Sequence, residues 1–573
     1  MKLVDALKAL KLMQLREGPL LRCGLAAGFN PLHLKTLLTA ELSEAFAAYR
    51  TEVSEGLYGD LLGNIERLAS NGFDYGFVLI EWSDLDSRLG LRSTARWSGN
   101  ELADILATAK ARAFQIQKAL DRAGQHLTLA VSLPTLPLPP TACSPRWQAG
   151  AFQLELRVIA QSLASALSVY PQLRILNSEW MDLESPLRDR HDPESELRAG
   201  FPYRLLHASA LASALRKLVE RRSPKKGLIT DLDETLWKGI LGEDGVDGIS
   251  WSLEHNSQVY AFYQRFLGAL ASEGVLIAVA SRNELSLVEQ AFGRSDLAID
   301  PDRIFPVEAN WKDKSGSVDR ILRLWNIGAD AVIFVDDNPR EIAEVKAAFP
   351  AIDCVQFPAG NTPAVYDMIL QLRDWFGKSA VIEEDAIRLA SIRRSHMAVE
   401  SENIAVGGLL PEQIQAEIVC DFKHSFADAR PLELVNKTNQ FNLNGKRYTD
   451  AEWRRFLTTP GSFLMSASYR DKFGPLGKVA VLAGSMEGRT LTIHAWVMSC
   501  RAFARRIEYR CLAELLDHFD PAQVVFDYSK TERNGPIQDF LTEILGEVPS
   551  PGSTAVREKL SPLAVKTQEA VYG

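Results

Sequence analysis

The chain has 573 residues, of which 24% are charged and 46% are hydrophobic, so it can form three or four domains with large buried cores. Its net charge of −9 is spread without long runs of one sign, which argues against a nucleic-acid-binding tail and a basic membrane patch. The apolar runs are far shorter than the roughly 20 residues that cross a bilayer, and no signal core follows the first residues, so we expect a cytoplasmic protein without nucleic-acid or membrane partners.

The first region, from about residue 20 to residue 215, alternates short apolar runs with longer helical patterns. This alternation predicts an α/β domain with a parallel sheet. Prolines between 134 and 145 mark a long loop on the side where such folds keep their sites, so a ligand could approach there. The predicted strands are 23–27, 77–82, 127–133 and 173–176, and a covering helix is predicted at 101–123.

A polar, proline-broken stretch at 221–226 leads into the second region, which runs to about residue 375. Strands and helices alternate again, which predicts a doubly wound sheet. The predicted strands are 227–230, 275–280, 331–335 and 352–356, and the predicted helices lie near 257–273, 284–293, 315–326 and 340–348.

The third region follows a charged helical link near 380–400 and has the pattern of an α+β domain. We therefore place the domains at 1–220, 221–378 and 379–573. The predicted strands of the third region are 463–469, 478–483, 490–497 and 523–527, and its helices lie near 450 and at 505–517.

The second region carries the elements of a phosphoryl-transfer site in chain order. Parallel sheets bind ligands beyond the carboxyl ends of their strands. A phosphorylated substrate that enters among carboxylates requires a hard divalent cation with oxygen ligands, and Mg²⁺ is the expected one. The elements are Asp231 and Asp233 after the first strand, Ser281 after the second, Lys314 at a helix start, and Asp336 and Asp337 after the strand at 331–335.

These residue types can divide the chemistry among them. Asp231 would attack phosphorus and Asp233 would protonate the leaving oxygen. Lys314 and Ser281 would hold the phosphoryl oxygens. Each residue taken alone fits a cap, a turn or a solvated helix position, but their joint order favours catalysis. The predicted metal ligands are Asp231, Asp233, Asp336 and Asp337.

This set, DxDxT followed by a strand-ending Ser, a Lys and DD, resembles the haloacid dehalogenase superfamily of aspartate-nucleophile phosphatases. The blocks DLDETLWKGILGEDG, ANWKDKSGSVDRIL and NIGADAVIFVDDNPRE resemble its FkbH-like branch, subfamily IIIC. The resemblance implies an enzyme of polyketide-type biosynthesis that takes a glyceryl unit from 1,3-bisphosphoglycerate, removes phosphate, and loads the unit onto an acyl carrier protein. It also implies that Thr235, Arg282 and Asn283 bind substrate. Family members commonly read CSKN where this chain has Ala280 before Ser281, so no covalent acyl step can use position 280.

The third region resembles the same family through a TNQFN block and an SCR block, in a domain similar to GNAT acyltransferases. Cys500 is the candidate thiolate nucleophile, and Arg501 could lower its pKa or meet the phosphate of a phosphopantetheine arm. A buried strand-end cysteine is the structural alternative. Asn439 and Gln440 could bind a polar acyl group, and turn or cap roles fit them equally.

The first region resembles the SGNH-hydrolase-like domain that precedes the phosphatase unit in long family members. A working hydrolase needs a serine after its first strand, but the chain reads AAGFN at 26–30, so we expect no hydrolysis. His207 is either a remnant of a catalytic histidine or a structural residue at a helix start. The domain could dock a carrier protein or fix the domain geometry.

Three functions follow from these residues. The leading one is a Mg²⁺-dependent enzyme that dephosphorylates a small phosphorylated acyl donor and loads the acyl group onto a carrier thiol. The second is a small-molecule phosphatase without acyl transfer. The third is a non-catalytic scaffold that docks a carrier protein.

Overall fold

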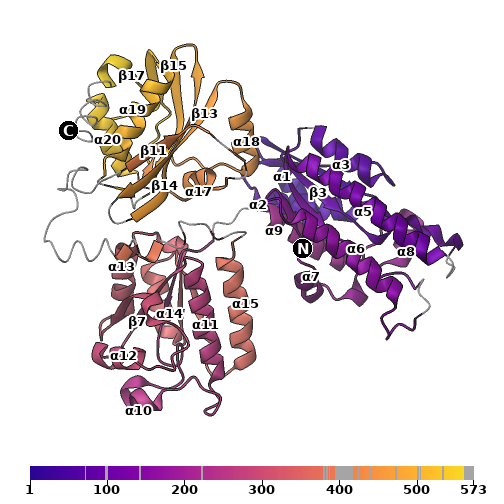
Figure 1. The fold of residues 1–573 in the computed structure, drawn as a ribbon, viewed down its shortest axis with the longest axis horizontal. Coiled ribbons are helices and arrows are strands. Elements are labelled where there is room, and N and C mark those ends of the chain that lie inside the picture. Colours follow the sequence, from indigo (N-terminus) through magenta and orange to yellow (C-terminus); the bar gives the residue numbers. More distant parts are fainter. Residues whose placement is uncertain are drawn as a thin grey trace. The chain divides into compact units, whose positions relative to one another are not determined.

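The computed structural model describes residues 1–560 except for 71, 97–100, 141–143, 221–223, 379–380, 382–384, 386–387, 391, 394–416, 424, 427, 439, 472–473, 500–501, 504 and 532–533. The described part forms two compact units, Met1–Arg222 with Tyr448–Phe456, and Ser223–Arg447 with Leu457–Gly573. A sheet lies in each of the three regions, coloured indigo, magenta and orange in Figure 1. None of the described helices has the length and apolar character to cross a membrane.

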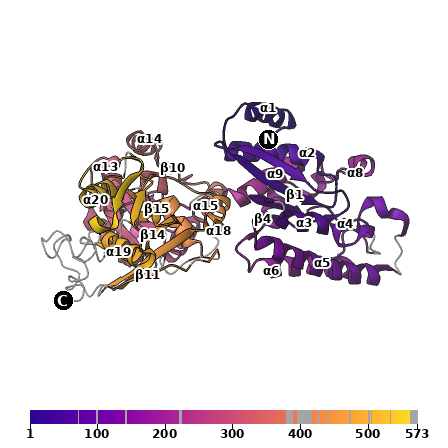
Figure 2. The same cartoon turned by 90° about the horizontal axis from the view of Figure 1, so that it is seen from above.

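The sheet of the first unit is parallel, in the order β2-β1-β3-β4-β5, as the alternation of elements predicts. Helices cover both of its faces, with α1, α2 and α9 on one side and α3, α5 and α6 on the other (Figure 2). Such burial on both faces explains the nearly continuous apolar strands. The elements are β1 (Leu20–Ala27), β2 (Arg50–Glu55), β3 (Tyr75–Leu79), β4 (Thr128–Ser132), β5 (Leu173–Ile175), α1 (Leu3–Gln14), α2 (Leu32–Ala45), α3 (Leu61–Ser70), α4 (Trp82–Leu85), α5 (Leu102–Gly124), α6 (Ala151–Leu167), α7 (Ser178–Glu184), α8 (Pro193–Ala199) and α9 (Leu205–Val219).

His207 is a buried structural residue of α9. Its ring nitrogens lie 3.0 Å from the hydroxyl of Thr135 and 3.0 Å from that of Ser185, so both are paired inside the protein. Burial, with a smaller contribution from Arg190, lowers the pKa of His207 to about 3. A structural role for His207 therefore explains the hydrogen bonds of both ring nitrogens.

The neutral His207 makes the stability of the first unit depend on pH. The pKa of His207 is lower in the folded chain than the usual 6.5. The contribution of the neutral ring to the free energy of unfolding is therefore complete above pH 6.5 and is lost as the pH falls towards 3. We expect a loss of about 2 kcal/mol on going from neutral pH to about pH 5. His207→Gln keeps a donor and an acceptor without titrating, so it should remove this loss, measured by hydrogen exchange of α9. An equal pH dependence in both proteins would contradict the expectation.

The second sheet is also parallel, in the order β10-β9-β6-β7-β8, so the doubly wound prediction is confirmed. Helices α11, α12 and α15 pack on one face, and α13 and α14 on the other. Strand β8 was not predicted, because Pro306 interrupts its apolar pattern, and it lies at an edge, where proline is tolerated. The elements are β6 (Gly227–Thr230), β7 (Leu276–Ser281), β8 (Ile304–Ala309), β9 (Val332–Asp336), β10 (Asp353–Gln356), α10 (Leu241–Gly248), α11 (Gln258–Ser272), α12 (Leu285–Phe292), α13 (Lys314–Trp325), α14 (Pro339–Ala348) and α15 (Thr362–Phe376).

The third sheet is mixed, in the order β11-β13-β14-β15-β16-β17, with β12 paired to β15. The pair β15 and β16 is parallel, and the other pairs are antiparallel. The segment Tyr448–Phe456, which holds most of α18, belongs to the first compact unit, where Arg455 pairs with Asp74. The elements are β11 (Glu417–Asp421), β12 (Phe441–Asn442), β13 (Ser462–Asp471), β14 (Gly474–Glu487), β15 (Thr490–Met498), β16 (Gln523–Phe526), β17 (Ser553–Val556), α17 (Arg430–Lys437), α18 (Asp450–Thr458), α19 (Ile507–Phe519) and α20 (Gly535–Leu545).

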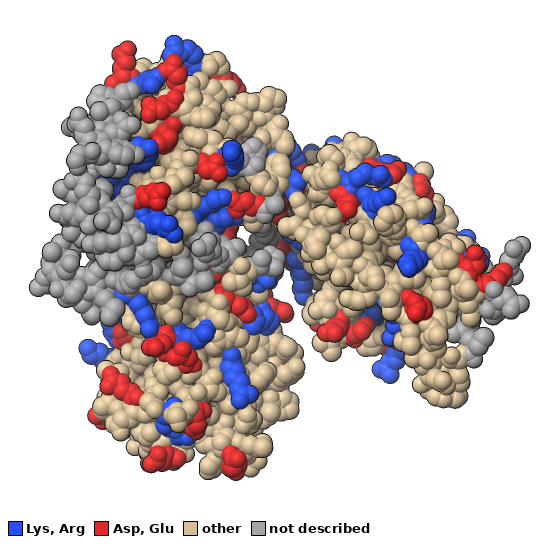
Figure 3. All heavy atoms as spheres, viewed as in Figure 1, with Lys and Arg blue, Asp and Glu red and all other residues tan. Residues whose placement is uncertain are grey.

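Acidic and basic side chains are interspersed on the face drawn in Figure 3. The even mixture matches the spread of charge along the sequence. This face carries no broad patch of one sign among its described residues, and the nature of the partners stays a prediction.

Candidate active site

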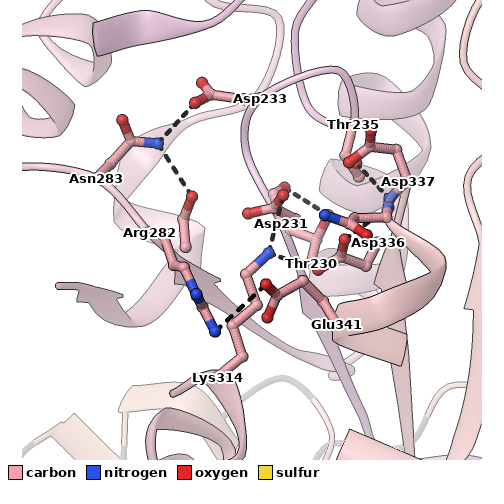
Figure 4. Close-up of polar contacts among 12 residues, drawn as sticks. Thr230, Asp231, Asp233, Thr235, Arg282, Asn283, Lys314, Asp336, Asp337 and Glu341 are labelled. Atoms are coloured by element: carbon pink, nitrogen blue, oxygen red, sulfur yellow. Dashed lines mark hydrogen bonds and ion pairs between the residues drawn. The ribbon is translucent and has the colours of Figure 1, made fainter. Parts of the chain in front are cut away.

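Three carboxylates meet at the carboxyl ends of the neighbouring strands β6 and β9. Thr230 is in register with Val335, and the amide of Asp231 donates to the carbonyl of Val335 at 2.9 Å, which brings the residues after both strands together. Carboxylate oxygens of Asp231, Asp336 and Asp337 lie within 4.8 Å of one another (Figure 4). The parallel pairing thus explains how residues a hundred positions apart form one cluster.

Lys314 lies between two of these carboxylates. Its ammonium Nζ is 3.0 Å from Oδ2 of Asp231 and 2.5 Å from Oδ2 of Asp336. The side chain comes from the first position of α13 and is only 5% exposed. Burial alone would lower the pKa of Lys314, but the carboxylates of Asp231 and Asp336 outweigh burial and raise it. Lys314 is therefore a charged group inside the site.

The cluster holds more negative than positive charge. Three carboxylates face one ammonium group, and burial, followed by the charge of Asp231, raises the pKa of Asp336 to about 7 and also raises that of Asp337. Oδ1 of Asp231 is buried and has no hydrogen-bond partner among the described residues. Such an acceptor is costly to bury unless a ligand satisfies it. An all-oxygen donor set of this charge fits a hard divalent cation, which Asp231, Asp336 and Asp337 could hold.

The carboxylate of Asp233, which we predicted as both a metal ligand and a proton donor, lies outside this cluster. Its Oδ1 accepts from the indole of Trp237 at 2.9 Å and the amide of Leu241 at 3.0 Å, and its Oδ2 accepts from Asn283 at 3.0 Å. These donors hold the side chain on the Asn283 side of the site (Figure 4). The arrangement gives no support to metal ligation by this carboxylate, and its role as a proton donor stays a prediction.

The turn after β7 lines the site with polar groups. Ser281 and Asn283 are 4% and 2% exposed, and Nδ2 of Asn283 donates to Oγ of Ser281 at 3.1 Å as well as to Asp233. Arg282 between them is exposed and pairs with Glu341 and Glu344 at 3.3 Å each. Ser281 and Asn283 therefore lie at the site, and Arg282 lies at its edge.

Ala280 points away from the site. It is fully buried in a cluster with Ile229 and with Val318 and Ile321 of α13. Successive side chains of a strand face opposite sides, so Ser281 faces the opposite way to Ala280. A thiol at position 280 would therefore lie in the core, and its absence says nothing about an acyl step.

Thr235, which the resemblance implies as a substrate-binding residue, lies in the interior. The residue is fully buried, and its hydroxyl accepts from the amide of Asp337 at 3.1 Å. No surface remains for a substrate, so we interpret Thr235 as a residue that positions the Asp336-Asp337 turn.

Replacing Thr235 with valine should leave the partly buried amide of Asp337 without its acceptor. We expect this to lower the free energy of unfolding by about 1–3 kcal/mol. Thr235→Ser keeps the hydroxyl and is the matched control, with a smaller loss from the missing methyl group. Urea unfolding measures both variants, and equal losses would contradict the proposed hydrogen bond.

Glu341 was missed by the sequence analysis. It lies in the first turn of α14, its Oε1 pairs with Arg282, and its buried Oε2 has no hydrogen-bond partner among the described residues. One sequence feature could have identified Glu341. It is an acidic residue in the first turn of the helix that follows the DD at the end of a strand. Figure 4 places its carboxylate close to Lys314 and Arg282.

The predicted acyl-transfer residues are mostly outside the described part of the chain. Cys500, Arg501 and Asn439 are not among the described residues, so their roles stay predictions. Gln440 is exposed beside the short strand β12. Its neighbour Asn442 is buried and accepts from two amides of the following turn, which matches the turn alternative for this block.

No protein-family model matches the chain, and no curated protein matches it. Among solved structures, the N-terminal part of a Bacteroides fragilis protein containing a phosphatase domain, in complex with Mg, is similar at 21% identity and a TM-score of 0.53, over 66% of this chain and 100% of that one. At this identity the likeness shows a shared fold alone. A putative GDSL-like lipase from Parabacteroides merdae, at 14% identity over 36% of this chain and 96% of its own, and an extracellular lipase from Streptomyces rimosus, at 13% over 35% and 100%, have TM-scores of only 0.23 and 0.24.

Proposed function

We propose that the chain is a Mg²⁺-dependent phosphatase of the haloacid dehalogenase type. The observation that carries this proposal is the cluster around Asp231, in which one carboxylate oxygen each of Asp231, Asp336 and Asp337 lies within 4.8 Å of the others. Oδ2 of Asp231 pairs with Lys314, and its buried Oδ1 has no hydrogen-bond partner among the described residues. The similar structure that contains a phosphatase domain was crystallised with Mg, which agrees with this donor set. Carboxylates buried this closely would be costly in a scaffold without a cation, which argues against the non-catalytic alternative.

The geometry suits attack by Asp231 on phosphorus. A carboxylate oxygen of Asp231 forms a bond to phosphorus while the bond to the leaving oxygen breaks, and Asp233 supplies a proton to that oxygen when the substrate is an ester. Lys314, Ser281 and Asn283 stabilise the charge on the phosphoryl oxygens. Asp231, Asp336 and Asp337 would hold Mg²⁺, which would offset the negative charge of the phosphoryl group when bound. Water then hydrolyses the phosphoaspartate and regenerates Asp231.

We also propose the more specific function that the FkbH-like resemblance implies. In it, a glyceryl-type unit is loaded onto an acyl carrier protein in polyketide-type biosynthesis. The thiolate of Cys500 would attack the carbonyl carbon of an acyl phosphate, break its bond to phosphate, and pass the acyl group to the thiol of a phosphopantetheine arm. The motifs at 438–442 and 499–501 support this step. A cytoplasmic location agrees with such a partner.

Phosphate release with and without Mg²⁺ tests the phosphatase. We expect phosphate release that requires Mg²⁺ and stops with a chelator, and calorimetry should detect Mg²⁺ binding that Asp336→Asn weakens. The matched control is Asp302→Asn, because Asp302 is 91% exposed and lies outside the cluster. Metal-independent release, or no binding of Mg²⁺, would reject the proposal.

Incubation with 1,3-bisphosphoglycerate and a phosphopantetheinylated carrier tests the loading step. We expect the mass of a glyceryl unit on the carrier, lost in Cys500→Ala while phosphate release from a simple ester persists. An unchanged carrier mass would leave the phosphatase alone as the function.

A further inference from the structure

The proline-containing loop after β4, which the proposed phosphatase does not use, lines a cavity in the first unit. The cavity has a volume of about 590 Å³, which is within the range of small-molecule sites. It lies beyond the carboxyl ends of the neighbouring strands β4 and β5, where parallel sheets commonly bind ligands. Its lining includes Pro134 and Pro137 of the loop, Ser132 at the end of β4 and Asn177 after β5. We call it the proline-loop cavity.

Helices α6 and α7 each turn one face to this cavity. The residues that they contribute are spaced three and four positions apart, and such residues lie on the same face of a helix. Their side chains, and not only their backbone, therefore border the cavity. The residues are Arg157, Ala160, Gln161 and Ala164 of α6, and Ser178 and Asp182 of α7.

Most of the other residues that line the cavity are apolar. Met181 and Leu176 are buried, with 0% and 9% of their surface exposed, and Ile175 and Leu133 are half-buried. A ligand with hydrocarbon groups would gain free energy by moving them from water to this surface. The lining therefore favours a ligand with an apolar body.

The charged groups of the cavity favour an anion. Three of the described residues that line it are charged, namely Arg157, Asp182 and Arg190. The side chain of Arg190 is 4% exposed, pairs with Asp182 at 2.5 Å and donates to three backbone carbonyls. Asp182 is thus already neutralised, whereas Arg157 has no ion-pair partner among the described residues. The lining therefore carries one positive charge in excess, although the whole chain has a net charge of −9.

We propose that the proline-loop cavity binds a small organic anion. Its apolar body would contact Leu176 and Met181, and its carboxylate or phosphate group would pair with Arg157, because a guanidinium group binds both kinds of anion. This inference goes beyond the proposed phosphatase and does not depend on it, since no residue of the carboxylate cluster belongs to the first unit. It gives a ligand-binding role to a domain in which we expect no hydrolysis.

Calorimetry with a matched pair of ligands tests the inference. n-Octanoate and octanamide have the same size and shape but differ in charge, and n-butyrate shortens the chain. The full-length protein is titrated in the presence of a chelator, so that Mg²⁺ cannot recruit an anion to the carboxylate cluster. We expect octanamide to bind at least about fivefold more weakly than n-octanoate. Affinity should fall about two- to fourfold for each methylene group removed. Equal affinities for n-octanoate and octanamide would overturn the inference.

Three variants locate the binding site. Arg157→Gln should weaken the binding of n-octanoate at least about fivefold and leave that of octanamide unchanged. Arg198→Gln is the matched control, because Arg198 is 79% exposed on α8 and does not line the cavity, and it should change neither affinity. Ala164→Phe places a ring at the wall of the cavity and should weaken both ligands, with thermal unfolding as the check of the fold. Unchanged n-octanoate binding in Arg157→Gln, or its loss in Asp231→Asn, would place the anion elsewhere and overturn the inference.

The same assay distinguishes two sources of the anion. One is a free organic acid, and the other is the phosphopantetheine arm of a carrier protein, which joins a phosphate to an apolar and amide-containing chain. Tighter binding of pantetheine 4′-phosphate than of n-octanoate, with the same loss in Arg157→Gln, would identify the arm. Tighter binding of n-octanoate would identify a free acid, and either result supports an anion site in this cavity. A failure of phosphate release leaves these titrations unaffected, so the phosphatase and the cavity are tested separately.

Discussion

Asp231→Asn is expected to reduce phosphate release at least about a thousandfold, because the amide that replaces the carboxylate cannot attack phosphorus. The exchange keeps the shape of the side chain and leaves Lys314 paired with Asp336. It also removes one of three close negative charges, so the fold should persist. Initial rates with saturating Mg²⁺ and a phosphate ester measure the loss, and circular dichroism measures the fold.

Trapping of the phosphoryl group sharpens this test. The unaltered protein should carry an acid-stable, base-labile phosphoryl group after rapid quenching with labelled substrate, and Asp231→Asn should carry none. Asp302→Asn is again the control, with unchanged rate and labelling. A variant at position 231 that keeps more than about a tenth of the rate would show that another group attacks phosphorus and would remove Asp231 from the mechanism.

Lys314→Met is expected to lower both activity and stability. The methionine fills the same buried space but leaves Asp231 and Asp336 without their cation, and breaking a buried ion pair in this way costs about 3–5 kcal/mol. Activity should fall about a hundredfold or more, because a donor to the transferring phosphoryl group is lost. Urea unfolding and initial rates, each with and without Mg²⁺, measure the two effects.

Titration of Asp336 makes the stability loss in Lys314→Met depend on pH. Its pKa is raised from 3.8 to about 7, so the protonated form favours the folded state, and stability is lost as the pH rises through 7. Lys314 stabilises the ionised form of Asp336, so its removal matters less when Asp336 is protonated. The loss in the free energy of unfolding of Lys314→Met should therefore be smaller at about pH 5 than at about pH 8. Lys312→Met changes an exposed lysine two positions earlier, and we expect an effect within about 0.5 kcal/mol. A pH-independent loss would contradict the assignment of Lys314 as the counter-ion of the cluster.

The buried strands were readable from the sequence, because parallel strands covered on both faces are continuous apolar runs. The edge strands β2 and β8 were not, since β2 has Val53 as its only apolar residue and β8 contains Pro306. The hydrophobic pattern also did not predict the direction in which each side chain points. Ala280 looked like a departure at the site until the strand placed it in the core beneath α13.

The sequence by itself determined which residue types stand at strand ends: Asp231 and Asp233 after β6, Ser281 at the end of β7, Lys314 at the start of α13, and Asp336 and Asp337 at the end of β9. It could do so because hydrophobic periodicity locates strand ends without knowledge of the sheet order. Only the tertiary structure decided that β6 pairs with β9, which brings Asp231, Asp336 and Lys314 together, and that Trp237, Leu241 and Asn283 draw Asp233 aside. Strand pairing and the bond from Asn283 depend on contacts between segments far apart in the chain, and the bonds from Trp237 and Leu241 depend on how the turn after β6 folds. Hydrophobic periodicity predicts neither.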